Sequence, residues 1–134
     1  MQALIVIDVQ NDFCPGGALA VAGGDEIVPG ITALMAQMDA VVLTQEWRPA
    51  GHCGFFENDH STPTGLHGYL QTRGVTQLTC VGIATDFCVN YTAVDAAKLG
   101  YTVEVRQELC RGIDFDGSLA AAKDAMDAAG VRRI

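Results

Sequence analysis

Hydrophobic positions along the chain fall into two alternating patterns, short apolar runs and longer stretches with helical spacing. The short runs have the length expected for strands in a sheet that is covered on both faces. They predict strands over residues 3–9, 40–44, 77–83, 101–105 and 131–134. Apolar residues that recur three or four positions apart predict helices over residues 25–38, 61–72, 88–99 and 116–129. This order predicts an α/β fold with a doubly wound, mainly parallel sheet and helices on both faces.

Local signals place some of the element boundaries. Ser61 or Thr62 is the expected cap of the second helix, with Pro63 in its first turn. Thr85 and Asp86 are expected to accept hydrogen bonds from the unpaired N–H groups of the helix that carries Cys88. Residues 110–112 are expected to form a loop at a strand end.

Length, charge and cysteine content narrow the class of protein. The 134 residues are expected to form a single domain over 1–134, and the net charge of −8 argues against nucleic acid and anionic membranes as partners. No apolar run approaches the roughly 20 residues of a membrane span, and the apolar start lacks the basic region of a signal peptide. Five cysteines without framework spacing favour a reduced, cytoplasmic protein. A homo-oligomer is compatible with the sequence.

Cys88 has the strongest chemical context in the chain. It follows a buried strand and a tight break in the run LTCVGIATDFCVN, where Gly82 and Ala84 allow close backbone approach. The start of a helix favours a thiolate, so we expect the pKa of Cys88 to fall below the free value of about 8.5. The same backbone amides are suited to an oxyanion. The alternative for this run alone is a small buried cysteine with a packing role.

Asp8 stands near the carboxyl end of the first strand, where open α/β sheets place their ligands. A carboxylate inside an apolar strand is costly unless it is paired or functional. The alternative is a cap for the following loop, but Asp12 begins the turn toward Pro15 and explains that loop better. We therefore favour Asp8 for catalysis and Asp12 for structure.

Two segments resemble a known family of enzymes. GIATDFCV, residues 82–89, is similar to the nucleophile segment of nicotinamidases and other isochorismatase-like cysteine hydrolases. ALIVIDVQNDFCPGGALAV, residues 3–21, is similar to the start of nicotinamidases in particular. The resemblance implies a Rossmann-like parallel sheet and a cysteine that attacks an amide carbonyl with help from an aspartate and a lysine.

The same resemblance implies roles for particular residues. Cys88 would be the nucleophile and Asp8 the general base, and the backbone N–H groups of Ala84 and Cys88 would form the oxyanion hole. A cis peptide bond would join Ile83 to Ala84, and Ile83 would border the substrate. Phe13 would stack on the substrate ring, with ordinary packing in its loop as the alternative.

The chain departs from nicotinamidases at their metal-binding Asp-x-His pair. Glu46 and Arg48 occupy the aligned positions, and His52 matches a later family histidine. Glu46 and His52 are therefore the candidate ligands for one divalent Zn, Mn or Fe ion. Arg48 cannot ligate because it is always protonated, so we expect no tightly bound metal.

A second departure concerns the catalytic lysine. In the family, a few tens of residues that hold a strand and this lysine separate the loop histidines from a Gly-Phe-Phe-like segment. Here Cys53 is followed directly by Gly54, and the only lysines are Lys98 and Lys123, neither at the family position. We expect that a family segment is missing between residues 53 and 54, either by true shortening or by omission from the sequence.

These motifs and departures leave three candidate functions for the chain. The first is hydrolysis of nicotinamide, a small-molecule substrate in the salvage of NAD, through a cysteine thioester. The second is metal-free action on another small amide or an enol ether, favoured by Arg48 because arginine can hold a substrate carboxylate. The third is a scaffold that binds a small molecule without chemistry, favoured by the missing lysine.

Overall fold

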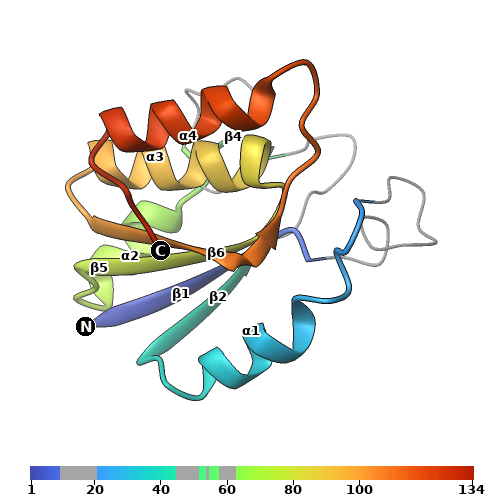
Figure 1. The fold of residues 1–134 in the computed structure, drawn as a ribbon. Coiled ribbons are helices and arrows are strands. Elements are labelled where there is room, and N and C mark those ends of the chain that lie inside the picture. Colours follow the sequence, from blue (N-terminus) through green and yellow to red (C-terminus); the bar gives the residue numbers. More distant parts are fainter. Residues whose placement is uncertain (10–20, 45–51, 54, 58–62) are drawn as a thin grey trace.

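The fold is described from a computed structural model, which covers residues 1–9, 21–44, 55 and 63–134 in full and the backbone of 52–53 and 56–57. Its strands are β1 (Gln2–Ile7), β2 (Ala40–Thr44), β3 (His52–Cys53), β4 (Phe56–Glu57), β5 (Gln77–Ile83), β6 (Thr102–Arg111) and β7 (Arg132–Arg133). Its helices are α1 (Val28–Met35), α2 (Leu66–Thr72), α3 (Asn90–Lys98) and α4 (Ser118–Ala128), and a π-helical turn, η2 (Thr85–Val89), precedes α3 (Figure 1). None of the helices in these ranges is long and apolar enough to cross a bilayer.

Five strands form one parallel sheet in the order β2-β1-β5-β6-β7, and β3 and β4 form a small antiparallel pair. The chain starts at β1, moves outward to β2, and then returns across β1 to β5. The direction in which strands are added therefore reverses between β1 and β5. The predicted doubly wound parallel sheet is confirmed.

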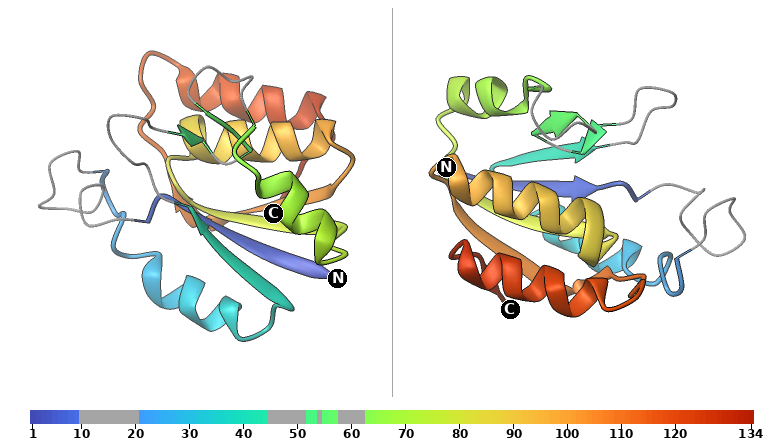
Figure 2. Two further views of the ribbon diagram at one scale, coloured as in Figure 1. Left: turned by 180° about the vertical axis from the view of Figure 1, so that it is seen from behind. Right: turned by 90° about the horizontal axis from the view of Figure 1, so that it is seen from above.

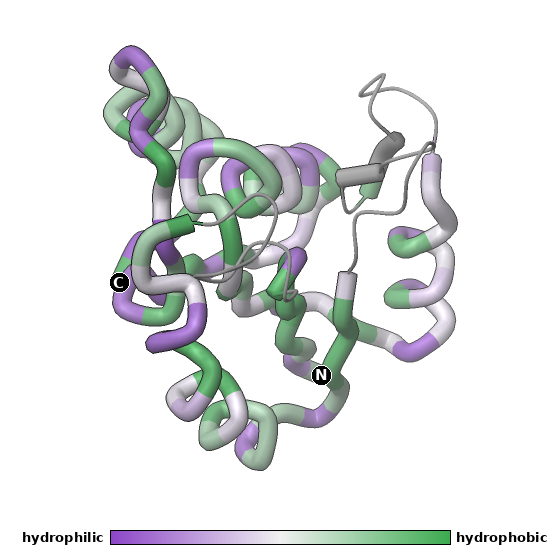
Figure 3. Tube along the Cα trace, turned by 90° about the vertical axis from the view of Figure 1, so that its right-hand side faces the viewer, coloured by the Kyte–Doolittle hydropathy of each residue, from purple (hydrophilic) through white to green (hydrophobic). Residues whose placement is uncertain are grey.

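The two faces of the sheet are covered by different helices, as the two views in Figure 2 show. Successive side chains of a strand point to opposite faces. Leu4 and Val6 pack with α1, whereas Ile5 and Ile7 pack on the side of α2, α3 and α4. Figure 3 shows that hydrophobic and hydrophilic residues also alternate along the helices. Burial on both faces explains why β1 is apolar along its whole length.

Gly82 allows β1 and β5 to approach each other at their carboxyl ends. Its φ angle of 123° is in the region that L side chains rarely adopt. A Cβ at this position would clash with the carbonyl oxygen of Ile7, far inside van der Waals contact. The backbone of Ile7 is therefore close to Gly82 only because that residue lacks a side chain.

We predict that Gly82→Ala destabilises the protein by about 2 kcal/mol or more, because it adds both a backbone clash and an unfavourable φ. Urea unfolding followed by circular dichroism measures this change. Gly68→Ala is the matched control, since Gly68 lies in α2 and a Cβ added there would meet nothing within 4 Å. That variant should be neutral or more stable by about 0.5–1 kcal/mol. Equal stability of the two variants would contradict the account.

Some element boundaries differ from the sequence-based predictions. The helix predicted from residue 61 begins only at Leu66, after Gly65 with a φ of 94°, and Pro63 lies in a bridge before it. Ser61 and Thr62 fall outside the described residues. The prediction of Pro63 in the first turn was wrong, because a residue in the left-handed region starts this helix instead.

The loop predicted at residues 110–112 was also wrong in part. Cys110 and Arg111 belong to β6, where they pair with Gly82 and Ile83 of β5. The register shifts between Cys80 and Gly82, so β6 bulges away and then pairs with β5 again. The bulge extends β6 to the carboxyl edge of the sheet.

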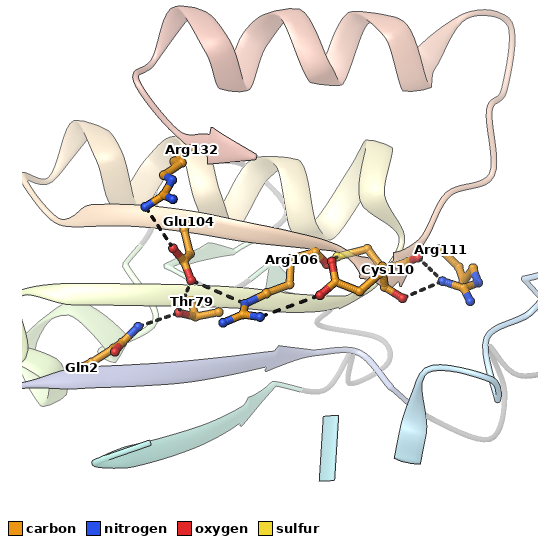
Figure 4. Close-up of polar contacts among 8 residues, drawn as sticks. Gln2, Thr79, Glu104, Arg106, Cys110, Arg111 and Arg132 are labelled. Carbon is orange, nitrogen blue, oxygen red and sulfur yellow. Dashed lines mark hydrogen bonds and ion pairs between the residues drawn. The ribbon is translucent and has the colours of Figure 1, made fainter. Parts of the chain in front are cut away.

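A polar network occupies the α1 side of the sheet, toward the amino ends of its strands (Figure 4). The amide of Gln2 donates to Thr79 Oγ1 at 2.9 Å, and Thr79 Oγ1 donates to Glu104 Oε1 at 3.5 Å. Glu104 also forms ion pairs with Arg106 at 3.6 Å and with Arg132 at 3.9 Å. These contacts give the fully buried hydroxyl of Thr79 its partners, which supports a structural role for the network.

Candidate active site

The candidate site lies at the carboxyl ends of β1 and β5, on the two sides of the point where the strand order reverses. Ile7 of β1 is paired with Gly82 of β5, so the residues that follow each strand emerge next to each other. Open α/β sheets bind ligands in the crevice at such a point. Asp8 follows β1 directly, and the turn that carries Cys88 follows β5.

Asp8 is almost completely buried, with 2% of its surface exposed. Its backbone N–H donates to the carbonyl of Thr44 at 3.2 Å, and the Thr44 hydroxyl donates to Asp8 Oδ1 at 3.2 Å. The end of β2 thus holds both the backbone and the carboxylate of Asp8. Asp8 also has a φ of 50°, a conformation that is uncommon for residues other than glycine and is found preferentially at functional sites.

Cys88 differs from the other described cysteines in its exposure. Cys80 and Cys110 are buried, while Cys88 is half-buried in η2. Burial raises the pKa of the Cys80 thiol far above its usual range and raises that of Cys110 to about 12. Neither buried thiol can supply a thiolate near neutral pH. Cys88 is therefore the described cysteine that fits a nucleophile best.

Ile83 and Ala84 connect β5 to this turn. A cis peptide bond joins them, as the resemblance implied. The Ile83 side chain is 2% exposed and packs in the core on the α1 side, and Ala84 is 6% exposed. The substrate-binding role of Ile83 and the oxyanion role of the Ala84 and Cys88 amides stay predictions.

Several predicted site residues fall outside the described part of the chain. Phe13, Glu46 and the side chain of His52 lie there, as does Asp12. Among the residues that the structure describes, no group of three or more His, Cys, Asp or Glu side chains could hold a metal ion. The described side chains by themselves therefore do not fit a metal ion.

The lysines lie away from the candidate site. Lys98 is in the last turn of α3, which runs from the carboxyl edge of the sheet to its amino edge. Lys123 is in the middle of α4. Neither matches the position of the catalytic lysine that the family resemblance implies.

Asp86 has a role that the sequence did not predict. It was expected to cap its own helix, but its carboxylate instead accepts from the N–H groups of Ile113 at 3.0 Å and Asp114 at 2.7 Å. The Ser118 hydroxyl donates to the same carboxylate at 2.6 Å. Because these partners are 27 or more positions away, no local pattern reveals them. Thr85 also lies inside the turn, which begins after Ala84.

The environment of Asp86 lowers the pKa of its carboxyl group. Burial alone would raise this pKa, but the hydrogen bonds from Ile113, Ser118 and Asp114 outweigh burial and favour the ionised form.

Phe115, in the same loop, is 74% exposed, so it does not pack in the core.

We predict that Asp86→Asn costs about 1–3 kcal/mol of unfolding free energy at pH 7, because buried donors lose their acceptor. A lowered folded-state pKa contributes stability above the unfolded value of about 3.9 and loses it as the pH falls through the folded value. The difference between wild type and variant should therefore shrink below about pH 4. Urea unfolding at about pH 7 and about pH 3 measures it, and a difference that grows in acid would contradict the assignment.

Comparison with known proteins agrees with this fold and shows the family of the chain. Residues 50–133 match the family model described as the isochorismatase domain. A nicotinamidase of Acinetobacter baylyi is 36% identical over 195 aligned residues, covering 98% of this chain and 91% of that protein. The chain therefore belongs to the isochorismatase family, and within that family it is similar to nicotinamidases.

Solved structures give the same relationship. A nicotinamidase/pyrazinamidase from Acinetobacter baumanii is 37% identical with a TM-score of 0.92, covering 99% of this chain and 95% of that one. A pyrazinamidase of Pyrococcus horikoshii, solved in complex with zinc, is 28% identical with a TM-score of 0.82, covering 99% and 98%. Metal binding thus occurs in the family.

The alignment with the Acinetobacter baylyi protein also bears on length. It extends over 195 residues, whereas this chain has 134. The alignment therefore contains gaps on the side of this chain. β2 lies at one edge of the described sheet, and its Val41 and Leu43 are 38% and 69% exposed.

Proposed function

We propose that this chain is a nicotinamidase-type amidohydrolase that converts nicotinamide and water to nicotinate and ammonia. The observation that carries the proposal is the placement of Asp8 and the Cys88 turn after adjacent parallel strands, where the strand order reverses. Membership in the isochorismatase family and similarity to nicotinamidases support the same chemistry. The free thiols of Cys80 and Cys110 fit a reducing compartment such as the cytoplasm.

In the proposed reaction, Asp8 accepts the proton of the Cys88 thiol, and the thiolate adds to the amide carbonyl. The backbone N–H groups of Ala84 and Cys88 stabilise the resulting oxyanion. Asp8 returns the proton to the nitrogen, the C–N bond breaks and ammonia leaves. Water then attacks the thioester, which releases nicotinate and restores the thiol. Phe13 and Ile83 would border the pyridine ring.

The missing lysine should weaken this catalyst. Groups that act as a unit lose several powers of ten in rate, roughly 10³ or more, when one member is removed. Lys98 and Lys123 lie in α3 and α4, and neither matches the position of the family lysine. We therefore infer a low turnover for the chain of 134 residues.

We also propose that the family segment with the lysine is missing between Cys53 and Gly54. The gaps in the alignment and the exposed apolar side chains of β2 both fit the loss of a neighbouring strand. Intact mass spectrometry of the natural protein tests this directly. A mass equal to that of the 134 residues supports true shortening, and a larger mass supports omission of a segment.

Glu46 and His52 are the residues that would hold a metal, and two protein ligands are fewer than a closed zinc site uses. Arg48 supports the second candidate, metal-free action on a small substrate with a carboxylate. Ammonia release from nicotinamide and from a panel of small amides, with and without added Zn or Mn, distinguishes nicotinamide hydrolysis from this second candidate. No preference for nicotinamide would remove the leading proposal.

We predict that Cys88→Ala and Asp8→Asn each reduce ammonia release from nicotinamide, the latter by about 10²–10⁴-fold, because proton transfer is lost. Asp124→Asn is the control, since Asp124 is an exposed carboxylate on α4. It should retain wild-type activity.

Iodoacetamide labelling of Cys88 across pH tests the non-catalytic scaffold. A midpoint near the free cysteine value of about 8.5 would support the scaffold, and a lower midpoint supports the hydrolase.

A further inference from the structure

The carboxylate of Asp86 connects three segments that are distant in sequence. Asp86 is in η2, two positions before Cys88, and is only 4% exposed. Its Oδ1 accepts from the Ile113 N–H, and its Oδ2 accepts from the Asp114 N–H and the Ser118 hydroxyl. Asp86 therefore joins η2 to the loop after β6 and to the first residue of α4.

The turn that Asp86 holds has a geometry that is rare in proteins. In η2 the Val89 N–H donates to the Ala84 carbonyl at 3.1 Å, five residues back, as in a π-helix. The turn begins without a side-chain cap on its N-terminal residue. Single π turns are rare and occur frequently at functional sites. We expect contacts with neighbouring segments to help stabilise such an uncommon conformation. The described contacts of Asp86 provide such support from outside the turn.

The loop is itself ordered around this carboxylate. The Ser118 hydroxyl accepts from the Phe115 N–H at 2.7 Å while it donates to Asp86. A Cβ on Gly112 would lie 3.5 Å from Asp86 Oδ1 and 3.0 Å from the Leu119 side chain. The loop thus packs directly on Asp86, and movement of either would move the other.

We propose that Asp86 is a positioning residue for Cys88: by binding the loop 112–118, its carboxylate fixes the π-helical turn in the orientation that favours the Cys88 thiolate. The inference rests on the proposed function, in which that thiolate is the nucleophile. Asp86 acts through the turn, because its own oxygens are occupied by donors from the loop and from α4.

The direction in which the pKa of the Cys88 thiol changes when Asp86 is replaced distinguishes a positioning role from a simple effect of charge. A negative charge two residues from Cys88 disfavours a thiolate, so its removal alone would lower the pKa of the thiol. Loss of positioning has the opposite effect, since the thiol then leaves the backbone amides at the start of the helix. Asp86→Asn keeps the shape of the side chain but presents an NH₂ group to donors.

The test is the pH midpoint of Cys88 alkylation by iodoacetamide, with each labelled cysteine located by peptide mass spectrometry. Asp86→Asn and Asp86→Glu should raise the midpoint, and the rate at about pH 7 should fall about tenfold for each pH unit by which the midpoint rises. Ser118→Ala, which keeps the charge but removes one donor, should raise the midpoint by a smaller amount and covers the case in which the Asp86 variants fold poorly.

Asp127→Asn is the matched control. Asp127 also accepts from a side-chain donor, Arg133 at 2.8 Å, but it lies at the other end of α4. This variant should leave the midpoint unchanged even if it lowers the melting temperature. A midpoint in Asp86→Asn that equals the wild-type value, or falls below it, would overturn the inference. The inference about Asp86 is tested by the difference in midpoint between variant and wild type. The proposed function is tested by the wild-type midpoint itself, so failure of one can be distinguished from failure of the other.

Discussion

The close parallel pairing of β1 with β5 is the constraint on which the candidate site depends. Gly82 permits this approach because any side chain there would meet the backbone of Ile7. The pairing brings the end of β1 beside the end of β5, so Asp8 and the Cys88 turn share one edge of the sheet. A sheet in which other strands separated these two would not bring Asp8 and the Cys88 turn to neighbouring strand ends.

The candidate site combines side chains with different degrees of burial, and this difference fits the roles that we propose for them. Asp8 and Asp86 are buried carboxylates that accept hydrogen bonds. The donor to Asp8 is Thr44 of β2, and the loop before α4 donates to Asp86. Cys88 is half-buried, whereas the thiols of Cys80 and Cys110 are buried in the core. A half-buried thiol and buried, hydrogen-bonded carboxylates together fit the covalent hydrolysis that we propose.

Much of the fold could be predicted from the sequence, because the central strands are continuous apolar runs. β2 and β5 have the predicted bounds. Asp8 was a candidate because open α/β sheets bind their ligands at the carboxyl ends of the strands. What could not be predicted depends on contacts between distant residues. The bulge that keeps Cys110 in β6 requires pairing with Gly82, and the loop partners of Asp86 come from beyond β6. The contact between Thr44 and Asp8 also forms only when β2 joins the sheet.

The most direct test of the account is a crystal structure of the protein with bound nicotinate. The account predicts the ligand at the carboxyl ends of β1 and β5, with its carboxylate within reach of both the Cys88 sulfur and the Asp8 carboxyl group. Nicotinate bound at another edge of the sheet, or in contact with only one of these two side chains, would contradict it.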